Sequence, residues 1–356
     1  MEMTIIMNRF LYIPVLFFCC LLSSCAQERI IDQIRIIQAI GLDIEGENIK
    51  ISASYPSYKS ASQKSLLTAE SKSINENFTI ITTESSQPVE IGQMRTLVLS
   101  EQYARKGISE IADIINQESL KSGNATIVIS KQTASSIISE TFKKPPYFLS
   151  ELIEQNMHNG NTPKTNYHSF VNQYYGEGQD VYLPAIKKDK GLLHMVGIGV
   201  FKEDKLKLWL TNKEGLYIKL LKEKALTGTY EFTTGQKEKY SIIILSGKRK
   251  IAMQNEKAAI SLKLTVQLRE FPTKINILQK EVIFGIKKKI EGKLASEIEA
   301  MLVQLQKNNV DTIGFGEQFR KQNRHYNQNE FDEKIYPKMV FDVNAEVIIL
   351  HSGVGH

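Results

Sequence analysis

Apolar and polar residues alternate along much of the second half of the chain. In residues 260–268 every second position is Ile, Leu or Val, and the positions between them are Ser, Lys, Thr and Gln. Residues 343–349 alternate in nearly the same way. A period of two residues is typical of a strand that buries one face and exposes the other. The pattern therefore predicts half-buried strands here, and the apolar runs at 195–201, 205–210 and 242–245 predict further strands.

One segment of the second half has a helical period instead. Its apolar residues recur every three or four positions from Ile286 to Leu305, and Asn308 follows. This spacing predicts a long helix that ends near Asn308 and packs its apolar face against the strands. Leu294 is expected to lie in the core, so a charge there should cost several kcal/mol. Replacing Glu297, on the polar side of the helix, is expected to change little.

The first half combines strand and helix patterns. A hairpin is predicted over residues 34–53, with its turn in the acidic stretch 45–48. Residues 56–77 are rich in Ser, Lys and Gln and are expected to form a loop. Two short apolar runs that predict buried strands are each followed by a helical pattern, an order typical of a small α/β unit. The predicted strands are 96–99, 125–129 and 181–186, and the predicted helices are 108–115, 134–140, 147–157 and 167–174.

The N-terminal segment has the layout of a secretory signal peptide. An apolar run covers residues 10–22, and two serines separate it from Cys25. The run is shorter than the roughly 20 residues that a membrane-spanning helix needs. Residues 22–25, Leu-Ser-Ser-Cys, match a lipobox, in which the cysteine sulfur carries diacylglycerol and the freed amine can be acylated. We predict that residues 1–24 are a signal peptide and that Cys25 is lipidated; an incidental cysteine is less favoured because Cys25 stands where the apolar run stops.

The cysteines support the same interpretation. All three of them, Cys19, Cys20 and Cys25, lie in this segment. No disulfide and no cysteine-based metal site are therefore expected in the mature domain. One acyl chain binds a membrane only marginally, so lasting attachment takes two or more, which a bacterial lipoprotein anchor supplies. The expected contact with the membrane is the diacylglyceryl cysteine.

The patterns together predict an α+β protein of more than one domain. A mixed α/β N-terminal region precedes a C-terminal, mostly antiparallel sheet packed on one long helix. The polar stretch 187–191 separates the two patterns. We therefore expect an N-terminal region over residues 25–190, of one lobe or two, and a C-terminal domain over residues 191–356.

Charge adds little to this picture. The formal net charge is +6, and part of it lies in the basic runs 248–250 and 287–289. These runs either contact anionic lipid head groups or are solvated faces of a lysine-rich protein, and the second interpretation is favoured. No nucleic-acid partner is expected, because the runs lack interleaved aromatic residues and the protein is expected to be exported.

No catalytic constellation stands out in the sequence. The six histidines are scattered, and none has another at the spacing of one helical turn. Gly197 and Gly199 resemble the start of a dinucleotide-binding loop, but Lys202 occupies the third glycine position. We therefore expect no enzyme activity, no catalytic residues, no metal and no small-molecule cofactor. The histidines are His158, His168, His194, His325, His351 and His356.

A turn with two glycines follows the predicted long helix. Asp311 is placed to cap the segment after it, and Gly314 and Gly316 permit backbone angles that other residues avoid. Phe315 lies between these glycines. The turn either joins two helices, with Phe315 filling the core, or contacts a partner subunit. The first alternative is favoured, because a Phe in this position more often fills a core.

These motifs resemble a known family. In the C-terminal half the resemblance is carried by residues 309–317, Asn-Val-Asp-Thr-Ile-Gly-Phe-Gly-Glu, and by the hairpin 196–211. In the N-terminal half, Cys25 and the stretches 40–43 and 97–108 match in order and spacing. The chain thus resembles the Ger(x)C spore-germination lipoproteins, the C subunits of GerA-type nutrient germinant receptors. The resemblance implies a non-catalytic subunit required for germination, anchored on the outer face of the spore inner membrane beside a multi-pass A subunit and a transporter-like B subunit.

Two other functions remain as alternatives. A solute-binding lipoprotein of a transporter would have two α/β lobes with a ligand cleft at their hinge, whereas this chain has a β-rich second half with one long helix. A lipoprotein enzyme is the weaker alternative, because no catalytic motif is present. The receptor subunit is therefore the favoured hypothesis.

Overall fold

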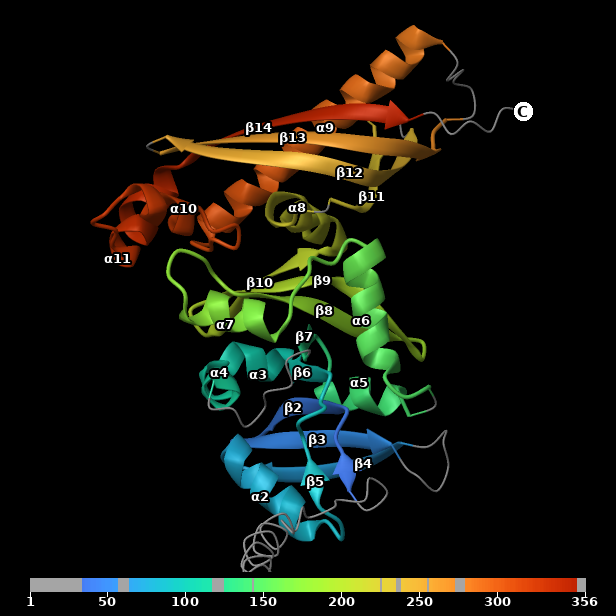
Figure 1. Ribbon diagram of the computed structural model, residues 1–356, viewed down its shortest axis with the longest axis vertical. Helices are drawn as coiled ribbons and strands as arrows, with labels where there is room; N and C mark the ends of the chain where they lie inside the picture. Colours follow the sequence, from blue (N-terminus) through green and yellow to red (C-terminus); the bar gives the residue numbers. More distant parts are fainter. Residues whose placement is uncertain are drawn as a thin grey trace, which may run out of the picture. The chain divides into compact units, whose positions relative to one another are not determined.

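The computed structural model describes residues 34–56, 64–116, 125–142, 144–224, 226–234, 238–254, 256–272 and 279–350. These residues form an eight-stranded sheet and a four-stranded sheet, each with helices packed on it, and a short pair of strands, β1 (Arg35–Ile36) and β5 (Val89–Glu90) (Figure 1). The predicted fold class is confirmed: a mixed α/β N-terminal region is followed by a smaller sheet on a long helix. The predicted signal peptide and Cys25 lie outside the described residues.

The eight-stranded sheet is mixed. Four neighbouring strands in its middle run parallel, and an antiparallel pair completes each side. The parallel strands are β2 (Ala39–Glu45), β6 (Thr96–Ser100), β7 (Thr126–Ser130) and β8 (Tyr182–Asp189). The flanking strands are β3 (Asn48–Pro56) and β4 (Lys64–Ser71) next to β2, and β9 (Leu192–Lys202) and β10 (Lys205–Thr211) next to β8.

Helices cover both faces of this sheet, which explains its continuous apolar runs. All five residues of β6 are buried, with Val98 in one core cluster and Leu97 and Leu99 in the cluster on the other face. The Val98 face is covered by α5 (Ala134–Glu140) and α6 (Phe148–Asn159). The opposite face is covered by α2 (Ile74–Glu84), α3 (Glu101–Lys106), α4 (Ser109–Asn116) and α7 (Tyr167–Tyr175).

The four-stranded sheet packs on the long helix α9 (Lys280–Lys307), as its sequence pattern predicts. Two of its three strand pairings are antiparallel, and the last is parallel. Leu294 of α9 is fully buried. The strands, in spatial order, are β11 (Gly228–Thr233), β12 (Lys239–Gln254), β13 (Lys257–Glu270) and β14 (Val340–Leu350). Between α9 and β14 lie α10 (Phe315–Gln322), α11 (Gln328–Glu330), a π-helical turn (Phe331–Ile335) and a 3-10 turn (Tyr336–Lys338).

Helix α8 (Asn212–Lys222) connects the two sheets through one hydrophobic core. Its Leu216 and Leu220 belong to the same buried cluster as Val200 of β9 and Ile242 of β12. The sheet that contains β8, β9 and β10 continues across residues 190 and 191, where we predict a domain boundary. The division of the chain at this point stays a prediction.

Several elements differ from the sequence-based expectations. Residues 56–77 do not form only a loop, because they include β4 and the start of α2. Helix α8 was not predicted, because seven consecutive residues from Gly215 to Leu221 are buried and leave no one-sided apolar pattern. Strand β11 was also not predicted. Among the described residues, no helix is both long and apolar enough to cross a bilayer.

Candidate functional site

The structure brings Asp311, Gly314, Phe315 and Gly316 together in the tight connection between α9 and α10. Helix α9 ends at Lys307 with Asn308 as its cap, and Asn309 has the left-handed angle φ 54° that often follows a helix end. The Asp311 carboxylate then accepts hydrogen bonds from the amides of Gly314 and Gly316, each at 2.8 Å. A side chain that binds two free amides at the start of a helix fixes the direction in which α10 starts.

A glycine is required at Gly314 for its backbone angle. Its φ is +87°, in the left-handed region that residues with a Cβ atom rarely adopt. Gly316 is required for a different reason, because a Cβ there would lie 2.8 Å from the Cα of Gly178. The second glycine therefore allows close contact with a distant part of the chain.

That distant part is the loop between α7 and β8. Glu317 donates its amide to the carbonyl oxygen of Gly178 at 2.8 Å. Gly178 has φ +87°, and a Cβ on it would lie 2.2 Å from the amide nitrogen of Glu317. The loop and the start of α10 thus meet backbone to backbone, with no room for a side chain between them.

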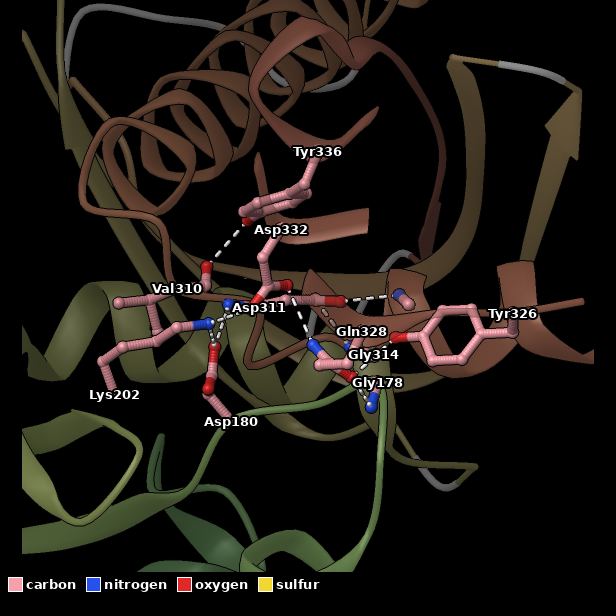
Figure 2. A network of polar contacts seen from close by, with 11 residues as sticks. Gly178, Asp180, Lys202, Val310, Asp311, Gly314, Tyr326, Gln328, Asp332 and Tyr336 are labelled. Carbon is pink, nitrogen blue, oxygen red and sulfur yellow. Dashed lines mark hydrogen bonds and ion pairs between the residues drawn. The ribbon is translucent and has the colours of Figure 1, made fainter. Parts of the chain in front are cut away.

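Charged and polar side chains surround this contact (Figure 2). Lys202 at the end of β9 forms ion pairs with Asp180, at 3.3 Å, and with Asp332, at 2.7 Å. Gln328 donates to Asp332 at 2.8 Å and accepts a hydrogen bond from the amide of Gly178 at 2.7 Å. We call the contacts among residues 176–180, Lys202, 310–317 and 326–336 the Asp311 junction.

Burial dominates the electrostatics of the junction. It raises the pKa of Asp311 to about 6, although the amides of Gly316, Phe315 and Gly314 act in the opposite direction. Burial also raises the pKa of Asp180, against the attraction of Lys202. Lys222 donates to the carbonyl oxygen of Thr312 at 2.9 Å, and burial lowers its pKa to about 8. These charged groups are therefore held in an environment that resists ionisation.

Phe315 points into the hydrophobic core and is fully buried. Its ring centroid lies 5.3 Å from that of Phe341 on β14. Nearby, Tyr336 donates its hydroxyl to the carbonyl oxygen of Val310 at 2.7 Å. The side chain of Phe315 therefore has no exposed surface in this structure with which to contact a partner.

The polar groups of the Asp311 junction hold the chain together and leave no reactive arrangement exposed. The carboxylates bind backbone amides and a lysine, and no histidine, cysteine or serine lies among the hydrogen-bonded groups of the junction. In the described part of the chain, no group of three or more His, Cys, Asp or Glu side chains is arranged to hold a metal ion. The arrangement is that of a structural joint.

A second junction, which the sequence did not indicate, is formed by Lys219 on α8. Its side chain is fully buried, and its ammonium group donates to the carbonyl oxygens of Met157 and Gly160, each at 2.8 Å. These carbonyls lie at the end of α6, where a cation is favourable. Asn161 adds two hydrogen bonds to the backbone of Thr229 on β11, each at 2.8 Å. In the sequence, Lys219 is one lysine among apolar residues, and this pattern does not indicate that it binds the end of another helix.

Comparisons with known proteins identify the family. The family model for the spore germination protein N-terminal domain matches residues 27–188, and the model described as spore germination B3/GerAC like, C-terminal, matches residues 196–353. The chain belongs to the GerAC-like spore germination protein family. Gly178 and Asp180 lie in the N-terminal match, and Asp311 and Asp332 lie in the C-terminal match, so the Asp311 junction joins the two family regions.

Relatives from Bacillus support this assignment over nearly the whole chain. Spore germination protein GerQC of Bacillus cereus is 29% identical over 349 residues, which cover 94% of this chain and 96% of the relative. The putative spore germination protein YfkR of Bacillus subtilis is 20% identical over 379 residues, covering 95% of each. The crystal structure of the GerBC protein matches with a TM-score of 0.51 and 15% identity, over 87% of this chain and 96% of that chain, which shows a shared fold.

Proposed function

We propose that this protein is a non-catalytic, lipid-anchored subunit of a spore nutrient germinant receptor and is required for the germination response. The observation that carries the proposal is the match of both family regions, in order, over residues 27–188 and 196–353. In this proposal the protein acts by binding, together with an A and a B membrane subunit. Its position is the outer face of the spore inner membrane, where diacylglyceryl Cys25 holds it.

The two junctions suit a subunit that relays a binding event. The Asp311 junction ties the loop before β8 to the start of α10, and the Lys219 junction ties the end of α6 to α8. Both are made of short, buried hydrogen bonds, so the segments that they join move together. Contact with a partner at one family region would therefore act on the other region.

The proposal is tested by deleting the gene and complementing it with variants. Spores without the protein should fail to germinate with at least one nutrient, and the natural protein should restore the response. Cys25→Ala should remove lipidation and the response together, because no other cysteine stands at the end of the lipobox. Cys20→Ala is the matched control, since it changes a neighbouring cysteine inside the apolar run and should remain lipidated.

Two outcomes would contradict the proposal. Deletion spores that germinate normally with every nutrient, while uptake of a solute by growing cells falls, would indicate a solute-binding lipoprotein of a transporter. A Cys25→Ala protein that fractionates with membranes and supports normal germination would contradict the lipid anchor.

A further inference from the structure

A cavity lies on the N-terminal region, outside the Asp311 junction and next to the Lys219 junction. It opens between α6, the start of α7 and the residues at the beginnings of β6 and β7. In Figure 1, α6 and α7 lie on either side of β7. The volume is about 620 Å³, within the range of roughly 300 to 1,000 Å³ that small-molecule sites occupy.

The rim of the cavity carries charges of both signs. Arg95 and Lys164 supply two cationic groups, and Glu154 supplies a carboxylate. Among the described residues, none of these three side chains forms an ion pair within 4 Å. The guanidinium of Arg95 instead lies over the ring of Tyr147, 5.0 Å from its centroid, which orients the group without neutralising it. Arg95 and Glu154 therefore have no ionic partner there, whereas Lys164 lies close enough to the Glu223 carboxyl for its charge to oppose the rise in pKa that burial causes in that group.

The floor of the cavity is polar and largely buried. Thr126 at the start of β7 is 6% exposed, and Thr165 in the loop before α7 is 7% exposed. The hydroxyl of Thr165 has no hydrogen-bond partner among the described residues. A buried polar atom without a partner costs about 1 to 3 kcal/mol, so a bound group that reaches it gains affinity.

We propose that this cavity binds a small zwitterion, with its carboxylate at Arg95 and Lys164 and its ammonium group at Glu154. A ligand with only an anionic group would be repelled by Glu154, and one with only a cationic group would be repelled by Arg95 and Lys164. Only a molecule that carries both charges satisfies the whole rim. The α-amino acids are the smallest common class with this chemistry.

The cavity shares its wall with the Lys219 junction. Met157, His158 and Lys164 line the cavity, and their backbone groups are held from the C-terminal region. Lys219 binds the carbonyl oxygen of Met157, Thr227 binds that of His158 at 3.1 Å, and Glu223 accepts the amide of Lys164 at 2.6 Å. A ligand bound in the cavity would thus act on the Lys219 junction. The inference rests on the proposed receptor function and gives it a ligand site.

The test uses the purified full-length protein in detergent and each common amino acid in turn, with calorimetric titration and thermal melting. At least one amino acid should bind with a Kd below about 1 mM and raise the melting temperature. Its analogues without the amino group or without the carboxyl group should bind at least about tenfold more weakly. Arg95→Gln and Glu154→Gln should each weaken binding by about tenfold, which corresponds to about 1.4 kcal/mol.

Matched controls are Arg269→Gln and Glu299→Gln, which change exposed side chains outside the cavity and should bind as the natural protein does. Binding by no amino acid, or equal binding by Arg95→Gln, would overturn the proposal. Equally tight binding of inorganic phosphate that Glu154→Gln does not weaken would also overturn it, in favour of a plain anion site. The same variants can be compared in spores. If deletion of the gene blocks germination but the Arg95→Gln variant responds normally, the ligand site is rejected and the receptor function still holds.

Discussion

Asp180 and Asp311 exchange two hydrogen bonds although they are 131 residues apart in the chain. The amide of Asp180 donates to the carbonyl oxygen of Asp311 at 2.8 Å, and the amide of Asp311 donates to the carboxylate of Asp180 at 2.7 Å. The same Asp311 uses its own carboxylate to fix the start of α10. One residue therefore both shapes the turn of the C-terminal region and attaches that turn to the N-terminal region.

The first prediction concerns the pH dependence that Asp311 brings to the fold. Its pKa is about 6 in the folded protein, above the value of about 3.9 in an unfolded chain. Folding therefore favours the protonated carboxyl, and this contribution is fully present below about pH 4 and is lost as the pH rises through about 6. The stability of the natural protein relative to Asp311→Asn should fall by about 2 kcal/mol between pH 4 and pH 7.

Denaturant unfolding at a series of pH values measures this difference. Asp342→Asn is the control, because the Asp342 side chain is 58% exposed and pairs with Lys257 at the surface. The difference for this control should stay nearly constant with pH, since exposed pairs contribute little. A difference for Asp311→Asn that also stays constant would mean that the carboxyl is not held in a desolvated site.

The second prediction concerns the contact between the two family regions at Gly178. Gly178→Ala should destabilise the protein by about 2 kcal/mol or more, because it adds left-handed strain and a clash with the amide of Glu317. Gly285→Ala is the matched control, since a Cβ on this helical glycine of α9 would meet nothing within 4 Å. The control should stabilise by roughly 0.5 to 1 kcal/mol. Equal midpoints of urea unfolding for both variants would contradict the close contact.

Local chemistry in the sequence was enough to predict the Asp311 turn but not the partners of that turn. The order Asp, Gly, Phe, Gly after a helix indicates a cap and a tight bend, and the structure has both. Gly178 and Asp180 have the sequence of an ordinary turn, because the residues around them do not indicate contacts with residues far along the chain. Contacts between distant segments leave no periodicity, so a single sequence does not show them.

The helices and strands likewise divide into those that the sequence predicts and those that it does not. Half-buried strands and the long helix α9 have one apolar face, so their periods predict them. Helix α8 is buried on all sides between two sheets, and its apolar run therefore has no helical period. Lys219 interrupts that apolar run as a surface residue would, although its side chain is buried and its ammonium group binds the end of α6.

The third prediction tests this buried lysine. Lys219→Met keeps the apolar stem but leaves the carbonyl oxygens of Met157 and Gly160 without their donor. The expected loss is about 1 to 3 kcal/mol of unfolding free energy, reduced by the desolvation that the ammonium group no longer suffers. Lys207→Met, on an exposed position of β10, is the control and should change stability by less than about 0.5 kcal/mol. A more stable Lys219→Met protein would show that the charge is retained at a net cost to the fold.

The fourth prediction revises the expectation for Glu297, which the helical pattern placed on the polar side of α9. Its carboxylate accepts hydrogen bonds from the hydroxyls of Tyr217 and Tyr230 and forms an ion pair with Lys213 at 2.7 Å. Both tyrosines are buried, so Glu297→Ala would leave two buried hydroxyls without an acceptor. The expected cost is about 1 to 3 kcal/mol.

Two further substitutions on α9 bracket this value. Leu294→Asp places a charge at a fully buried position and should cost the most, several kcal/mol, by desolvation. Glu299→Ala removes an exposed carboxylate two residues beyond Glu297 and should lie within about 0.5 kcal/mol of the natural protein. Midpoints of denaturant unfolding should therefore fall in the order Glu299→Ala, Glu297→Ala, Leu294→Asp. If Glu297→Ala unfolds together with Glu299→Ala, the two tyrosine hydroxyls find other partners and the carboxylate is not needed to hold α8 and β11 on the long helix.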